Sequence, residues 1–206
     1  MERPSKTMYY LGIAKAVAAR SPCLRRKFGA IIVVDDAIVS TGYNGPARGV
    51  NNCELGCLKD VKKAPHYSGY EWCPAVHAEE NAVINAARNG AMVKGGIMYV
   101  VGVKPSGELT ESVPCRRCKR VLINAGIVKV VTMNERGEVI EYDVKDWVRE
   151  DSEWCTPKRS NNRSMYDQNN KMHALPARNG QKLKPMHERC QVLDDNLMHG
   201  WYLNHR

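Results

Sequence analysis

Three residues in two short motifs have the types and the spacing of a catalytic zinc site. His77 begins the segment HAE, and Cys115 and Cys118 form a Cys-x-x-Cys pair that follows a proline. Zinc binds imidazole nitrogen and thiolate sulfur in a tetrahedron, and a catalytic site leaves the fourth position for water. The sequence therefore predicts Zn2+ held by one histidine and two cysteines, with one position open for chemistry.

Glu79 lies two residues after His77, where its carboxylate can lie beside the metal without binding it. It could then take a proton from a zinc-activated water and deliver it to a ring nitrogen and to a leaving amine. The two motifs together resemble the H-x-E and P-C-x-x-C signature of zinc nucleobase deaminases. The alternative is a structural zinc site with one ligand missing, which leaves Glu79 without a purpose.

These motifs need helices that begin next to strands. Apolar periodicity and turn residues predict helices over 5–20, 76–88, 114–125 and 144–154, and strands over 28–34, 37–43, 97–103, 128–133 and 138–142. Alternating strands and helices indicate an α/β protein, and the opening hairpin makes its sheet mixed. We expect a mixed central sheet of about five strands, flanked by helices. Both cysteines would then lie in a helix's first turn, whose positive end stabilises thiolates.

Four segments resemble the deoxycytidylate deaminase family. They are SPCLRRKFGAIIV (21–33), STGYNG (40–45), CPAVHAEENAVINAARNG (73–90) and PCRRCKRVLINAGI (114–127). The resemblance implies a three-layer cytidine-deaminase-like fold. It also implies hydrolytic deamination of dCMP to dUMP and ammonia, supplying dUMP for thymidylate synthesis.

The resemblance also implies substrate contacts. The Asn44 side chain would hydrogen-bond the sugar, and the Ala78 backbone would contact the pyrimidine carbonyl. Arg26 is the candidate for the 5′-phosphate, since a guanidinium offers paired donors, with Arg25 and Lys27 as rivals. The alternative for these three cations is a solvated turn.

A long segment, Asn44 to Pro74, shows no sustained period of either kind. Loops of this length inside compact domains are uncommon unless they are functional or held in place. The segment contains the right types and number of ligands for a closed structural zinc, and some family members resemble it in carrying a second zinc here. The candidate ligands are Cys53, Cys57, His66 and Cys73, with Cys23 as a replacement for one of them. The alternative is a set of free thiols.

Family members are commonly hexameric, and several respond to dCTP and dTTP near the loop that resembles 40–45. The resemblance therefore implies a homo-oligomer, dCTP and dTTP as effectors, and Mg2+ with a nucleotide effector. The next residues, GPARG at 45–49, depart from the family's usual Gly-x-Pro-x-Gly order. This departure concerns the effector site and not the catalytic one.

The composition sets the remaining limits. No apolar run approaches the about 20 residues that cross a membrane, and charges interrupt the first 20 residues, so we expect a cytoplasmic protein that does not bind membranes. The net charge of +9 favours an anionic partner. The rivals to dCMP are dCTP, cytidine and tRNA adenosine. A non-catalytic zinc protein that binds nucleic acid is less favoured, because Glu79 is intact.

The chain is expected to form one deaminase domain over residues 1–154, followed by a basic extension over 155–206. The extension is rich in Asn, Lys, Arg and Met, but Leu193, Leu197 and Trp201 recur at a spacing of four. A short terminal helix with this narrow stripe needs a surface on which to dock, either its own domain or a neighbouring subunit. The alternative is a disordered basic extension.

Overall fold

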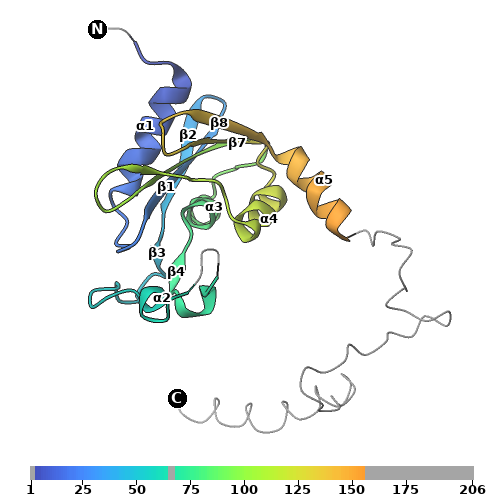
Figure 1. The fold of residues 1–206 in the computed structure, drawn as a ribbon. Helices are drawn as coiled ribbons and strands as arrows, with labels where there is room; N and C mark the ends of the chain where they lie inside the picture. The colour runs from blue at the N-terminus through green and yellow to red at the C-terminus, as the bar shows by residue number, and fades with distance from the viewer. Residues whose placement is uncertain (1–2, 65–67, 156–206) are drawn as a thin grey trace, which may run out of the picture. The chain divides into compact units, whose positions relative to one another are not determined.

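The computed structural model describes residues 3–64 and 68–155 (Figure 1). Their elements are, in chain order, α1 (Lys6–Ala18), β1 (Lys27–Val34), β2 (Ala37–Tyr43), β3 (Gly45–Pro46), α2 (Leu58–Val61), the 3-10 helix η1 (Tyr70–Trp72), β4 (Ala75–Val76), α3 (Ala78–Arg88), β5 (Ile97–Val103), β6 (Leu109–Thr110), α4 (Arg116–Ala125), β7 (Lys129–Met133), β8 (Val139–Asp143) and α5 (Val144–Cys155). None of these helices is both long and apolar enough to cross a membrane.

The main sheet has the strand order β2-β1-β5-β7-β8, and the short β6 pairs with β5. Strands β5 and β7 run parallel, whereas the other pairs are antiparallel. The predicted mixed sheet is therefore confirmed. The two-residue β6 was missed, as were β3 and β4 of the separate two-stranded sheet, because such short segments carry no period.

Helices cover both faces of the sheet (Figure 1). Ile31 and Val33 of β1 pack with α1. Ala30 and Ile32, which alternate with them along the strand, pack on the other face with α3, α4 and α5. Alternate residues of a strand point to opposite faces, so a strand buried on both sides reads as a continuous apolar run. The predicted three-layer arrangement is confirmed.

Two glycines let helices lie directly on the strands. A Cβ atom added to Gly29 of β1 would come within 2.2 Å of the Ala14 carbonyl oxygen in α1. One added to Gly42 of β2 would come within 2.3 Å of the Ala82 nitrogen in α3. Because Gly42 has no Cβ atom, α3, the helix that follows His77, can lie directly on β2.

The first helix is shorter than predicted and buries a different side from the one that its apolar residues indicate. In the sequence, a rough apolar face over 5–20 consists of Met8, Leu11, Ile13, Ala16 and Val17. Of these only Leu11 is fully buried, together with Tyr10, Ala14 and Ala18. Apolar residues occur around most of this helix, so its pattern does not define one face. The close approach to Gly29 decides which side is buried.

Candidate active site

The ends of two helices carry the predicted metal ligands. Helix α3 begins at Ala78 and α4 at Arg116, two residues later than the sequence suggested in each case. His77 and Cys115 are the N-cap residues and have extended backbones, with ψ of 157° and 164°. Strand β4 ends at Val76 and leads directly into His77. Val76 pairs with Gly45 of β3, which ties the residue before His77 to the segment after β2.

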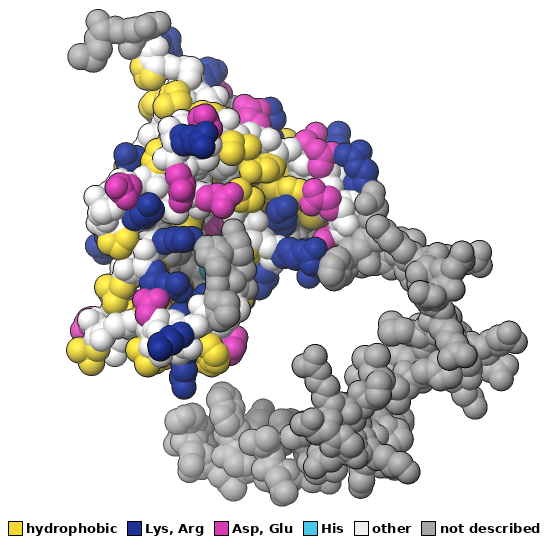
Figure 2. All heavy atoms as spheres, in the orientation of Figure 1, with side chains coloured by type: hydrophobic (Ala, Val, Ile, Leu, Met, Phe, Trp, Pro, Cys, Tyr) yellow, Lys and Arg dark blue, Asp and Glu magenta, His cyan; other side chains and the backbone are white. Residues whose placement is uncertain are grey.

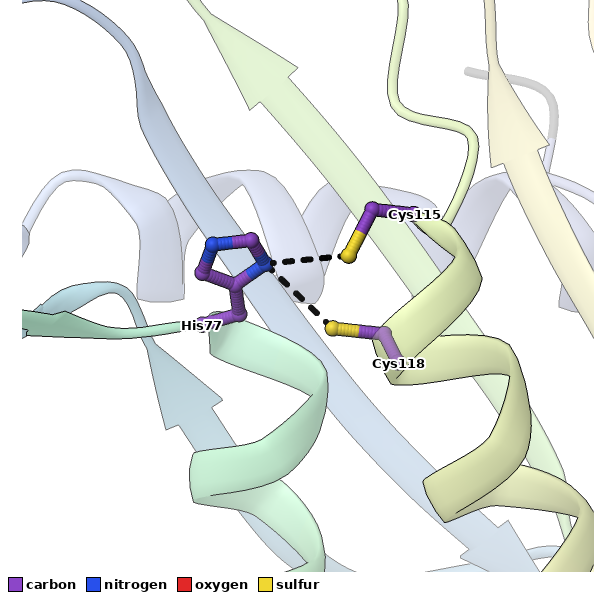
Figure 3. A group of neighbouring side chains, drawn as sticks. All are labelled: His77, Cys115 and Cys118. Carbon is purple, nitrogen blue, oxygen red and sulfur yellow. Dashed lines mark hydrogen bonds between the residues drawn. The ribbon is translucent and has the colours of Figure 1, made fainter. Parts of the chain in front are cut away.

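The three side chains point toward one another (Figure 3). The Nδ1 atom of His77 lies 3.6 Å from Cys115 Sγ and 3.3 Å from Cys118 Sγ. Tetrahedral zinc, with bonds of about 2.0 Å to nitrogen and about 2.3 Å to sulfur, holds such ligand pairs about 3.6 Å apart. The donor set and its spacing therefore fit zinc. Among the described residues, this is the one group of three or more His, Cys, Asp or Glu side chains close enough to share an ion.

Their surroundings shift the pKa values of the two cysteines in opposite directions. The hydrogen bond from the Cys118 thiol, followed by the contact with His77, lowers the pKa of Cys115 to about 3. The adjacent Cys115 thiolate and burial raise the pKa of Cys118. Zinc binds cysteine as the thiolate, so metal binding here would release protons from the thiols.

Glu79 is a buried carboxyl group at the same place. It is 6% exposed, and burial raises its pKa, while the neighbouring His77 acts in the opposite direction. A carboxylate with few water contacts is a stronger base than one at the surface. This is the property needed by a group that accepts a proton and then returns it.

A cavity of about 180 Å³ lies in front of these groups. The residues predicted for catalysis and substrate binding that line it are Arg26, its rival Arg25, Asn44, His77, Ala78, Glu79 and Cys115. Three candidate ligands of the second metal, Cys23, Cys57 and Cys73, line it as well. Sequence reasoning missed other lining residues, among them Phe28, Lys59, Tyr70 and Glu111. Lys59 and Tyr70 come from the segment without a period. Phe28 lies in the family-like segment 21–33, where it was predicted only as part of a strand, and no motif marks Glu111.

Cations from separate segments border the cavity. Figure 2 shows several Lys and Arg side chains in the lower part of the visible face, around α2. Arg25 pairs with Asp60 at 3.0 Å, and the Lys59 ammonium lies 4.8 Å from the centre of the Tyr70 ring. Arg26 forms no ion pair within the described part of the chain, so it is the guanidinium left for an anionic ligand. Lys27 does not line the cavity.

Hydrogen bonds to its own chain fix the Asn44 side chain. Its Oδ1 atom lies 2.7 Å from the Ser21 hydroxyl and accepts from the Phe28 backbone N–H at 2.7 Å. Its Nδ2 atom donates to the Arg26 carbonyl at 3.0 Å. One amide N–H remains, so the sequence-predicted partner of Asn44 in a ligand has to be a hydrogen-bond acceptor.

The four candidate cysteines for a second metal come close to one another. Cys23, Cys53, Cys57 and Cys73 line one further cavity, and burial together with these three neighbours raises the pKa of Cys53. No three of the four sulfur atoms lie within 4.8 Å of one another. The other candidate, His66, lies outside the described residues.

Residues 4–134 match the model of the family described as the cytidine and deoxycytidylate deaminase zinc-binding region. Over 140 residues, the chain is 36% identical to the deoxycytidylate deaminase of Mycobacterium phage D29, a match that covers 66% of this chain and 99% of that protein. The Schizosaccharomyces pombe deoxycytidylate deaminase is 32% identical over 130 residues, which cover 63% of this chain and 37% of that one.

A solved structure shares the fold. The dCMP deaminase of cyanophage S-TIM5, in complex with dCMP and dUMP, is 25% identical, with a TM-score of 0.50. The match covers 73% of this chain and 94% of that chain.

Proposed function

This chain belongs to the family of zinc-binding cytidine and deoxycytidylate deaminases, and from that premise we propose that it hydrolyses dCMP to dUMP and ammonia. The observation that carries the proposal is the grouping of His77, Cys115 and Cys118 beside the buried carboxyl group of Glu79, at a cavity bordered by Arg26. The product would supply dUMP for thymidylate synthesis.

Zinc bound by His77, Cys115 and Cys118 would supply an activated water as the nucleophile for C4 of cytosine. Glu79 would accept a proton from that water and pass it to the ring nitrogen. Glu79 would then take the second proton of the same water, now on the oxygen bonded to C4, and deliver it to the departing amine. The C4–N bond breaks, the C4 carbonyl forms and ammonia leaves. Burial of Glu79 keeps competing water away from these transfers.

Three further residues would hold the nucleotide. The Ala78 backbone, at the first position of α3, would contact the pyrimidine carbonyl. Asn44 would donate its remaining amide N–H to a sugar oxygen. The Arg26 guanidinium would bind the 5′-phosphate, which distinguishes dCMP from cytidine.

The proposal includes a second, structural zinc in the segment before α3. Support comes from the shared cavity of Cys23, Cys53, Cys57 and Cys73, which supplies four thiols even without His66. Because their sulfur atoms are not yet within bonding range of one point, the loop would tighten around the ion.

Assembly and regulation rest on the family resemblance alone. On that resemblance we propose that the chain forms a homo-oligomer, that dCTP and dTTP act as effectors, and that Mg2+ binds with a nucleotide effector.

A substrate panel tests the proposed reaction. Ammonia release should be measured from dCMP, dCTP, cytidine and a tRNA anticodon stem, with zinc content determined on the same sample. We expect the highest kcat/KM on dCMP. A higher kcat/KM on another member of the panel would make that compound the substrate and leave the proposed reaction, hydrolytic deamination, unchanged. Zinc-loaded protein that releases no ammonia from any of them would instead favour a non-catalytic zinc protein.

A further inference from the structure

An ion pair joins the two helices that carry the metal ligands. The Nη2 atom of Arg117, in α4, donates to the Oε2 atom of Glu80, in α3, at 2.8 Å. Arg117 lies between Cys115 and Cys118 in the chain, and Glu80 follows Glu79. The Glu80 side chain is 15% exposed and that of Arg117 is 59% exposed, so the carboxylate is largely removed from water.

The same carboxylate oxygen also holds the backbone of the histidine ligand. Oε2 of Glu80 accepts the His77 backbone N–H at 3.3 Å, as the N3 residue of a capping box does. One oxygen atom thus contacts both the N-cap of α3 and a side chain from the first turn of α4. Through it, the position of His77 is coupled to the helix that carries both cysteines.

The arginine compensates the charge of a carboxylate that is largely removed from water. Glu80 is 15% exposed, and the Arg117 guanidinium is its ion-pair partner at 2.8 Å. Without the guanidinium, this carboxylate would lose that partner, and an unpaired carboxylate with little access to water costs free energy.

We propose that Glu80 and Arg117 are positioning residues that hold α3 and α4 at the separation at which His77, Cys115 and Cys118 bind one zinc ion. The inference rests on the proposed zinc function and deepens it. Neither residue would touch the substrate. Groups that orient metal ligands change metal affinity by about 10-fold to 100-fold when they are removed.

A second ion pair on the same helix supplies the control. Arg120 of α4 donates to Asp151 at 2.9 Å and is 57% exposed, close to the 59% of Arg117, and Asp151 belongs to α5, which carries none of the proposed ligands. Arg117→Met and Arg120→Met therefore remove equally exposed arginine charges from α4. Glu80→Gln keeps the shape of the side chain and removes its charge, and Arg117→Lys keeps the charge and loses the fork of donors.

The measurement is the rate at which the folded, zinc-loaded protein releases zinc to 4-(2-pyridylazo)resorcinol. The relevant release phase is the one that keeps its amplitude in Cys57→Ser, where the second proposed site is broken. We expect release to be about tenfold faster or more in Arg117→Met and in Glu80→Gln. Arg117→Lys should lie between those variants and wild type, and Arg120→Met should match wild type. Melting temperatures are recorded for all of them.

Wild-type release rates in both Arg117→Met and Glu80→Gln would overturn the inference. Equal acceleration in Arg120→Met would also overturn it, because loss of any ion pair on α4 would then have the same effect. A wild-type protein without that release phase would instead refute the zinc site on which the inference rests.

Discussion

At the scale of single residues, the proposed reaction depends on one carboxyl group whose surroundings differ from those of the other acids in the described part of the chain. Glu79 is 6% exposed and faces the cavity from the first turn of α3, whereas Glu138 lies at an exposed turn and accepts a hydrogen bond from Asn134. Burial raises the pKa of Glu79 and makes it a better base. Both residues are glutamates, and the difference in burial is what suits Glu79 to accept and return a proton.

The first prediction concerns this carboxyl group. Glu79→Gln keeps the size of the side chain and removes proton transfer, so kcat should fall at least about 100-fold while zinc content and melting temperature stay near wild type. Steady-state ammonia release and metal analysis of the same sample provide the measurement. Glu138→Gln is the control and should leave kcat unchanged. If Glu79→Gln retained wild-type turnover with zinc bound, the assigned role would be wrong.

The second prediction concerns the phosphate. Arg26→Ala should lower kcat/KM on dCMP about tenfold or more and leave deoxycytidine nearly unaffected, because a charged hydrogen bond contributes about 1.5–3 kcal/mol. Lys27→Ala, outside the cavity lining, is the control. Equal losses on both substrates would mean that Arg26 supports the fold. A selective loss in Arg25→Ala instead would assign the phosphate to that rival.

At the scale of elements, the segment between α1 and β1 is held to the end of β2 through Asn44. The Ser21 hydroxyl lies 2.7 Å from Asn44 Oδ1, and the Asn44 amide donates to the Arg26 carbonyl. The residue predicted to contact the sugar therefore also fixes the backbone of the residue predicted to contact the phosphate. A loss of order here should change substrate binding more than it changes the sheet.

The third prediction separates these effects with two buried serines. Ser21→Ala removes the hydroxyl beside Asn44, and Ser40→Ala removes a hydroxyl that donates to the Ala82 carbonyl at 2.6 Å, away from the cavity lining. Each should lower the free energy of unfolding by about 1 kcal/mol. Only Ser21→Ala should also raise KM for dCMP. Urea unfolding and steady-state kinetics measure the two quantities. If Ser21→Ala had the same KM for dCMP as Ser40→Ala, the Ser21 hydroxyl would not be needed to position Asn44 for substrate binding.

The fourth prediction counts metal ions. Purified protein should contain close to two zinc ions per chain if both sites exist, and Cys57→Ser should lower the count by about one. The catalytic ligands His77, Cys115 and Cys118 are untouched by this change, so one ion should remain. Elemental analysis against protein concentration gives the count. One zinc per chain, unaltered by Cys57→Ser, would remove the structural site.

At the scale of the whole molecule, the sheet sets the two metal-binding helix ends side by side. Helix α3 follows β4, and α4 follows β6, which pairs with β5 in the centre of the sheet. Strands β5 and β7 are parallel neighbours, and α4 connects them on the face that α3 also covers. The two cysteines, which are 38 and 41 residues from His77 in the chain, thus lie beside it as candidate zinc ligands.

The fifth prediction concerns residues 155–206, which beyond Cys155 lie outside the described part of the chain. If the stripe of Leu193, Leu197 and Trp201 docks at a subunit interface, deletion of residues 156–206 should lower the mass in solution and the melting temperature. Light scattering and thermal unfolding of the full and shortened chains provide the measurement. An unchanged oligomer with an unchanged melting temperature and full activity would show that the extension has no such role.

The sequence by itself predicted the main elements and the three residues that the structure brings together as a candidate metal site. The apolar run at 28–34 and the turn at Asp35 and Asp36 predict the opening hairpin, because burial on both faces leaves no polar alternation. His77, Cys115 and Cys118 could be assigned to one ion because zinc restricts both the donor types and their number. Such signals are local, or they are imposed by an ion that the residues must share.

Only the tertiary structure decided which residues face the cavity and which helix sides are buried. Arg25, Arg26 and Lys27 are equivalent cations in the sequence, but the fold pairs Arg25 with Asp60 and leaves Lys27 outside the cavity lining. Glu80 was not singled out, because its partner Arg117 lies 37 residues away in another helix. Contacts between distant segments depend on how the layers pack, and neither periodicity nor composition records that packing.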